Sequence, residues 1–238
     1  MSIRTMIFID GNWLYRSRPV LFEKLNEPNG FEIDYRRLPK IMCEDVESYL
    51  DRDIDLVRTV YFGTIPSARS GFNTGKQSSF YNFLESSCGY ETEIHEVQVN
   101  GSEPRNDEQW VVSALSGGLM YYTAINAFDI AIVLGDDCNY APALRRVRQL
   151  GKRVQIVGVH ALDGKTVPPN AVYLKTRVSD FPPIYLENHA EEMRLVRAAQ
   201  KRVCRECGRE EETTWAGADF FCSECRGKRH SGNEEERS

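Results

Sequence analysis

Several features that mark whole classes of protein are missing from this sequence. No apolar stretch approaches the ~20 residues that span a bilayer, and the first residues run into a predicted strand without the apolar region of a secretion signal. A cytoplasmic location is therefore the expectation. No glycine-rich loop of the Walker type is present, so nothing supports a nucleotide hydrolase or small-molecule phosphatase beyond the acidic residues described below, whose chemistry would serve those reactions too.

An excess of positive charge is missing as well. The chain of 238 residues has 30 Lys and Arg against 35 Asp and Glu, which gives a net charge of -5. A broadly basic surface that coats nucleic acid is not expected, although a local basic patch remains open. The four histidines are scattered and receive no predicted role. With 41% apolar residues, the chain can fold into one large domain with an appended module.

Two short apolar runs are present, and each leads into acidic residues. Residues 6–9 are followed at once by Asp10, and residues 129–134 lead into Asp136 and Asp137. The carboxyl ends of parallel strands lie at one edge of a sheet, so these acids could converge there. Clustered carboxylates suit Mg²⁺ or Mn²⁺, which hold phosphates and activate water. Taken singly, each acid could instead be a helix N-cap or an exposed loop charge.

The first 160 residues alternate between predicted strands and helices. This order predicts an α/β fold: a doubly wound, mainly parallel sheet with helices on both faces. The predicted domain covers residues 1–186, a polar helix over 187–202 links it to a small module at 203–227, and a disordered charged tail follows at 228–238. The remaining elements are strands at 56–65, 90–99, 153–159 and an edge strand at 171–175, with helices at 12–22, 38–50, 77–87, 106–126 and 141–150.

Basic residues are found in three places close to predicted strand ends. Arg69 lies in a loop rich in Ser, Gly and Arg, Lys76 opens the next predicted helix, and Arg145 stands on the polar side of the helix at 141–150. Such residues are commonly solvated surface charges. They are also candidates for contacts with the phosphates of a substrate.

Four stretches of the sequence resemble the NYN domain family of PIN-like nucleases. They are residues 8–12, 127–134, 137–142 and 150–154, within a match over about residues 3–185. The resemblance implies a doubly wound α/β domain with an acidic metal site that hydrolyses phosphodiester bonds, usually in RNA. It makes Asp10 and Asp137 primary ligands of Mg²⁺ or Mn²⁺. It also implies that Asn12 orients a ligand or the phosphate and that Asp136 assists.

The sequence departs from the family pattern at several acidic positions. Asn139, a neutral and poorer ligand, replaces the second Asp of the acidic turn, and Val112 and Gly118 occupy acidic positions of the long helix. Glu108 lies one turn before Val112 and could substitute, or it could be ordinary first-turn charge. Two hypotheses follow: a metal-dependent endoribonuclease, or a degenerate pseudo-nuclease that binds RNA or acts as a scaffold.

The cysteine pattern near the C-terminus is the most specific motif in the chain. Cys204 and Cys207 form one pair, and Cys222 and Cys225 form another fourteen residues later. This spacing predicts a structural Zn²⁺ held by four thiolates in a zinc ribbon. The ribbon could dock RNA or a protein partner, or it could serve only to fold the module. Nearby basic residues favour RNA: Lys201, Arg202, Arg205, Arg209, Arg226, Lys228 and Arg229.

Overall fold

The computed structural model divides the chain into two compact units, residues Met1–Arg194 and Leu195–Ser238. Each unit is described by itself. The described residues are 2–27, 30–67, 73–98, 107–135, 137–162, 165–166, 177–196, 199–213 and 219–226; for 107–108, 161–162 and 165–166 only the backbone is described. Within this part of the chain, no helix is both long enough and apolar enough to cross a membrane.

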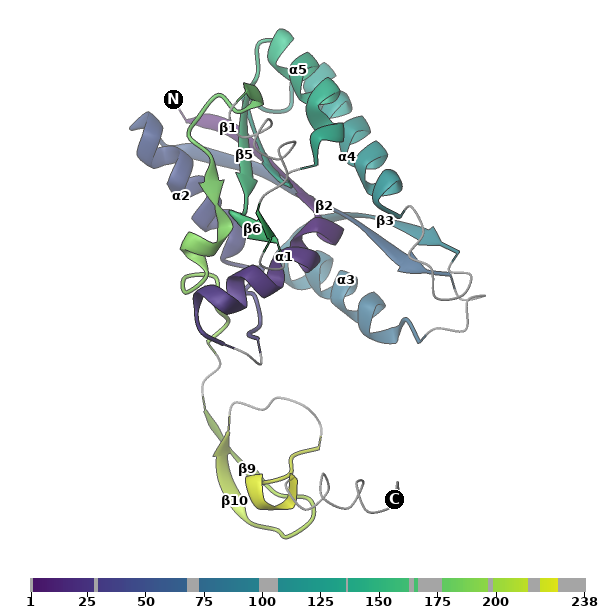
Figure 1. Cartoon of the computed structure of the whole chain (residues 1–238), viewed down its shortest axis with the longest axis vertical. Coiled ribbons are helices and arrows are strands. Elements are labelled where there is room, and N and C mark those ends of the chain that lie inside the picture. Colours follow the sequence, from purple (N-terminus) through teal and green to yellow (C-terminus); the bar gives the residue numbers. More distant parts are fainter. Residues whose placement is uncertain are drawn as a thin grey trace. The chain divides into compact units, whose positions relative to one another are not determined.

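The larger unit is built on a parallel sheet of six strands in the order β3-β2-β1-β4-β5-β8 (Figure 1). All five strand pairs in this sheet are parallel, as predicted from the alternation of strands and helices. A short antiparallel pair, β6 and β7, follows β5. The strands are β1 Ile3–Asp10, β2 Ile54–Pro66, β3 Glu91–Val97, β4 Ile130–Leu134, β5 Arg153–Gly158, β6 Ala161–Leu162, β7 Lys165–Thr166 and β8 Ile184–Tyr185.

Helices cover both faces of the sheet and create two separate cores. Alternate side chains of a strand point to opposite faces, so Ile7 and Ile9 of β1 pack with α1, α2 and α3, whereas Met6 and Phe8 pack with α4 and α5. All four side chains are fully buried. This confirms the doubly wound α/β fold. The helices are α1 Gly11–Lys24, α2 Leu38–Leu50, α3 Gly75–Cys88, α4 Asp107–Ala124 and α5 Ala141–Gln149, with one-turn 3₁₀ helices η2 Cys138–Tyr140 and η4 Leu186–His189.

The direction of strand addition reverses between β1 and β4. From β1 the chain proceeds outward to β2 and β3, and after α4 it returns to β4 on the other side of β1 and continues to β5 and β8. Ile9 and Leu134, at the carboxyl ends of β1 and β4, are paired. In open α/β sheets, ligands bind beyond the strand ends at this reversal point.

The helix predicted over residues 187–202 is not formed, which corrects that expectation. The chain makes one 3₁₀ turn at η4 and then packs back on the larger unit: Asp34 donates its N–H to the carbonyl of Met193 at 2.7 Å, and Arg194 pairs with Glu27 at 2.6 Å. These tertiary contacts replace the hydrogen bonds of a helix whose polar sequence has little packing of its own. Residue 106, the predicted strand at 171–175 and the tail at 228–238 lie outside the described residues.

The smaller unit contains a two-stranded antiparallel hairpin. Its strands are β9 Gln200–Val203 and β10 Glu210–Thr213. The hairpin brackets the first cysteine pair, since Cys204 and Cys207 lie in the connection between β9 and β10.

Candidate functional site

Asp10 is a buried acid at the carboxyl edge of the sheet. It ends β1 and caps α1, and its Oδ1 accepts the N–H of Trp13 at 2.8 Å. Only 4% of the residue is exposed. The helix can start this close to the sheet because residue 11 is Gly: a Cβ there would lie 2.3 Å from the ring of Tyr61. Local sequence therefore fixes both the position and the burial of the carboxylate.

Tyr140 holds the second oxygen of this carboxylate. Its hydroxyl donates a hydrogen bond to Oδ2 of Asp10, although the two residues are 130 positions apart. Gly135 permits the approach, since a Cβ there would lie 3.1 Å from the Tyr140 ring. Burial raises the pKa of Asp10, and the hydrogen bond from Tyr140 acts in the opposite direction. A buried carboxylate in this state gains stability from a nearby cation.

Asp137 approaches the same tyrosine from the other strand of the reversal point. It is half-buried and caps η2 by accepting the N–H of Asn139 at 2.9 Å. Burial raises the pKa of Tyr140, and the charges of Asp10 and then Asp137 add to that rise. Asp10 thus accepts a hydrogen bond from the Tyr140 hydroxyl, and Asp137 caps the 3₁₀ turn that contains Tyr140. Asn139 contributes through its backbone, and its side chain is exposed.

A neutral polar pair lies on the β2 side of Asp10. The side-chain amide of Asn12 donates to the hydroxyl of Thr64 at 3.2 Å. Thr64 lies near the carboxyl end of β2, and its carbonyl accepts from the hydroxyl of Tyr81 at 2.8 Å. Asn12, two residues after Asp10, is therefore positioned by Thr64 of β2, whose carbonyl is in turn bonded to α3.

Arg16 supplies positive charge that the sequence analysis did not identify. It is an exposed residue of α1, and its charge lowers the pKa of both Asp10 and Tyr140. Arg16 is four residues after Asn12, so both lie on one face of α1. That spacing was the available signal for Arg16. Tyr140 gave no such signal, because a tyrosine in this position could equally belong to the core.

The other predicted site residues are less closely connected to the acids. Lys76 and Arg145 are exposed on α3 and α5. The side chains of Asp136, Glu108 and Arg69 lie outside the described part of the chain. Where the family has acids on its long helix, Val112 packs against the core, and a Cβ on Gly118 would be 3.0 Å from Phe62. These positions serve packing.

The donor set around Asp10 and Asp137 suits a hard divalent cation. Each carboxylate oxygen has two lone pairs, so the contacts of Asp10 with Trp13 and Tyr140 leave acceptor capacity. Oxygen donors are the preferred ligands of Mg²⁺ and Mn²⁺. Among the side chains the structure describes, no three carboxylates gather within metal-binding reach. Two acids with water molecules would suffice for Mg²⁺, which usually keeps part of its hydration shell.

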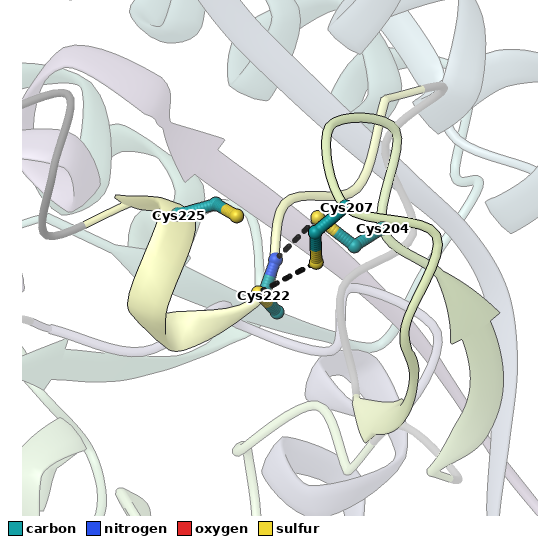
Figure 2. Close-up of side chains that lie close together, drawn as sticks. All are labelled: Cys204, Cys207, Cys222 and Cys225. Atoms are coloured by element: carbon teal, nitrogen blue, oxygen red, sulfur yellow. Dashed lines mark hydrogen bonds between the residues drawn. The ribbon is translucent and has the colours of Figure 1, made fainter.

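The four cysteines of the smaller unit form a complete metal-binding group (Figure 2). All four sulfurs lie within 4.8 Å of one another, and those of Cys207 and Cys222 are 3.6 Å apart. Tetrahedral zinc with Zn–S bonds of about 2.3 Å places neighbouring sulfurs about 3.8 Å apart. The arrangement is compatible with structural zinc and leaves no ligand position open for catalysis.

Backbone N–H groups favour the thiolate form of one of these cysteines. The N–H groups of Cys207 and then Cys222 lower the pKa of Cys204 to about 6. The pKa of Cys225 is raised to about 12, first because its sulfur shares a hydrogen bond with Cys222. Cys204 is thus the more acidic of these two thiols. A bound cation would replace those protons, because zinc binds thiolates.

Much of the positive charge of the smaller unit is paired. Arg205 forms an ion pair with Asp219, and Arg209 pairs with Glu224 at 2.6 Å. In the hairpin, Lys201 and Arg202 lie opposite Glu212 and Glu211. This reduces the weight of the basic residues that had favoured RNA as a partner of the ribbon.

Three comparisons with known proteins were informative to different degrees, and the family match covers most of the larger unit. The family model for the NYN domain matches residues 4–181. A search of curated proteins finds no match. Among solved structures, VPA0982 from Vibrio parahaemolyticus, a protein of unknown function, aligns with a TM-score of 0.50 and 14% identity over 78% of this chain and 93% of that one. A candidate UDP-N-acetylglucosamine 2-epimerase from Listeria monocytogenes aligns with a TM-score of 0.38 and 14% identity, over 76% of this chain and 38% of that one.

Proposed function

Because the chain belongs to the NYN family, whose PIN-like domains have nuclease-related and RNA-related functions, we propose that it is a metal-dependent endoribonuclease. The substrate is RNA, and the reaction is hydrolysis of a phosphodiester bond at the carboxyl ends of β1 and β4. One observation carries the proposal: Asp10 and Asp137 follow neighbouring strands at the reversal point of the sheet, where the hydroxyl of the buried Tyr140 donates a hydrogen bond to Asp10.

Each residue of the site has a distinct part in the proposed reaction. Asp10 and Asp137 would hold Mg²⁺ or Mn²⁺, which when bound activates water and neutralises charge on the attacked phosphate. Tyr140 keeps the Asp10 carboxylate in one orientation. Asn12 is a neutral donor for a phosphate oxygen, and the exposed charge of Arg16 attracts the RNA backbone toward the acids.

Cleavage of structured and single-stranded RNAs by the pure protein, with Mn²⁺, Mg²⁺ or neither, tests the proposal. Asp10→Asn and Asp137→Asn remove ligand charge, while Asn remains a good helix cap. We expect each variant to lose about 10²–10³-fold in cleavage rate. Asp55→Asn, at an exposed position of β2, is the matched control and should cleave normally. Absence of metal-dependent cutting by folded, zinc-loaded protein would overturn the proposal.

A pseudo-nuclease that binds RNA is the second candidate. The observation in its favour is that α4 uses Val112 and Gly118 for packing, at positions where the family has acids. Binding of RNA with no cleavage under any metal condition would support this candidate. A ligand set reduced to Asp10, Asp137 and Asp136 predicts weak metal affinity in either case, because fewer charged ligands compensate the ion.

A further inference from the structure

His160 is an exposed histidine that is held in place by three contacts with two residues. It follows β5, and 59% of its side chain is exposed. Its backbone N–H donates to Oε1 of Glu187 at 2.9 Å, and its ring Nδ1 contacts the same oxygen. The imidazole also stacks on the ring of Tyr185, with centroids 3.6 Å apart and an angle of 15° between the planes. An exposed side chain is rarely restrained to this degree by chance.

Burial of the Glu187 carboxylate costs more free energy than a purely structural contact would justify. Its side chain is 7% exposed, and its Oε2 has no hydrogen-bond partner among the described residues. A buried polar atom without a partner destabilises the fold. A carboxylate that binds Nδ1 of a histidine fixes the ring orientation. Nε2, on the far side of the ring, is the nitrogen left for an external ligand.

The chain places His160 at the same edge of the sheet as the acids. β5 lies beside β4, and Gly135 donates its N–H to the carbonyl of Val157 at 3.1 Å. Asp137 lies two residues beyond Gly135, and His160 lies three residues beyond Val157. On the other side, α1, which begins at the Asp10 cap, contacts both β6 and η4. His160 therefore follows the strand on the β5 side of β4, at the same edge of the sheet as the acids, whereas Asn12 and Thr64 lie on the β2 side.

We propose that His160 is a further catalytic residue, the general acid that protonates the leaving oxygen. This inference rests on the proposed ribonuclease function. A water oxygen forms the new bond to phosphorus and releases its proton to solvent. The bond from phosphorus to the leaving ribose oxygen breaks, its electron pair stays on that oxygen, and the proton on Nε2 moves to it. The imidazole then takes a proton from solvent. Glu187 and Tyr185 are positioning residues.

An RNA with sulfur in place of the leaving ribose oxygen tests this role. The ends of the products from unmodified RNA show which bridging oxygen leaves, and the sulfur is placed there. A thiolate leaves without being protonated. We expect His160→Gln to slow cleavage of normal RNA about 10²–10³-fold and cleavage of the sulfur-containing RNA less than about threefold. Glu187→Gln should show the same selectivity with a smaller loss.

His95→Gln is the matched control, since His95 also stacks on an aromatic residue, Trp110, but belongs to β3. It should affect both RNAs equally or not at all, and thermal unfolding verifies that each variant is folded. Equal loss on both RNAs in His160→Gln, or no loss, overturns the inference while wild-type cleavage stands. Wild-type protein that cleaves neither RNA overturns the ribonuclease proposal and this inference with it.

Discussion

The acidic site and the cysteine group bring their residues together by opposite routes. The four cysteines lie within one short segment, residues 204–225, and their spacing alone brings the sulfurs together. Asp10 and Tyr140 are separated by 130 positions and meet only because β1 and β4 are neighbours. The local motif therefore predicts a metal-binding group from its spacing alone. The acidic site depends on the fold, and its ligands look ordinary one at a time.

The two regions should also depend differently on metal. The larger unit has two extensive apolar cores on either side of β1. Among the described residues of the smaller unit, the core consists of three cysteines with Phe220 and the partly buried Phe221. A module this small cannot bury enough apolar surface to fold alone. Metal is therefore expected to be a folding requirement in the smaller unit and a ligand of an already folded site in the larger one.

Among these substitutions, Cys222→Ser should have the largest effect, and it tests the metal dependence of the smaller unit. Structural zinc contributes on the order of 10 kcal/mol to folding of such modules, so the variant should lose its zinc and the amide-exchange protection of residues 199–226. The larger unit should keep its unfolding temperature. Metal analysis and hydrogen exchange measure both. Cys138→Ser, outside the cluster, is the control. Retained protection without zinc would show that the module folds by packing alone.

Tyr140→Phe should have an intermediate effect, confined to the larger unit. Loss of the hydroxyl leaves the buried Asp10 carboxylate with one donor fewer, at a cost of about 1–3 kcal/mol. Because burial raises the pKa of Asp10, the folded state holds its proton to higher pH than the unfolded state does. Without added metal, stability should therefore fall as pH rises above the ordinary Asp pKa of about 3.9.

Denaturant unfolding measured across that pH range separates the contributions of individual acids to the pH dependence of stability. The fall in the free energy of unfolding with rising pH should be larger in Tyr140→Phe, since the hydrogen bond lowers the pKa of Asp10. Asp10→Asn should remove the part of the fall that comes from Asp10. Asp129 should have the opposite effect on the pH dependence of stability, because its hydrogen bond with Arg4 lowers its pKa. Its contribution is lost as pH falls. A flat profile in the wild type and in both Asp10 and Tyr140 variants would show that Asp10 is not destabilised by burial.

The sheet was predictable from the sequence because each strand carries its own signal. The apolar run at 130–134 is fully buried on both faces, which is the pattern of a central parallel strand. Periodicity likewise located α2 and α5. The prediction of a helix over residues 187–202 was wrong. The backbone of this segment forms a hydrogen bond with residue 34, and the side chain of residue 194 forms an ion pair with Glu27. Such distant partners leave no local trace.

The candidate site was predictable only in part for the same reason. Acids at strand ends are visible, since the strand signal ends where they begin. Tyr140 and Glu187 are invisible, because burial of a polar group depends on what packs around it. His160 was set aside for lack of neighbouring histidines, and its partner Glu187 lies 27 positions away. Residues that position a metal-binding or catalytic side chain are therefore harder to predict from the sequence than that side chain itself.

Replacement of single arginines should give the smallest effects, and it tests whether the zinc ribbon binds RNA. Arg205 is paired with Asp219, so Arg205→Gln should change RNA affinity less than about twofold. Arg16 attracts phosphates toward the acids, so Arg16→Gln should weaken affinity about fivefold and reduce the slope of log K against log salt by about one. Fluorescence anisotropy with labelled RNA, without added divalent metal, measures both. A larger loss in Arg205→Gln would place the main RNA contact on the ribbon. The acidic site would then depend on that contact to capture its substrate.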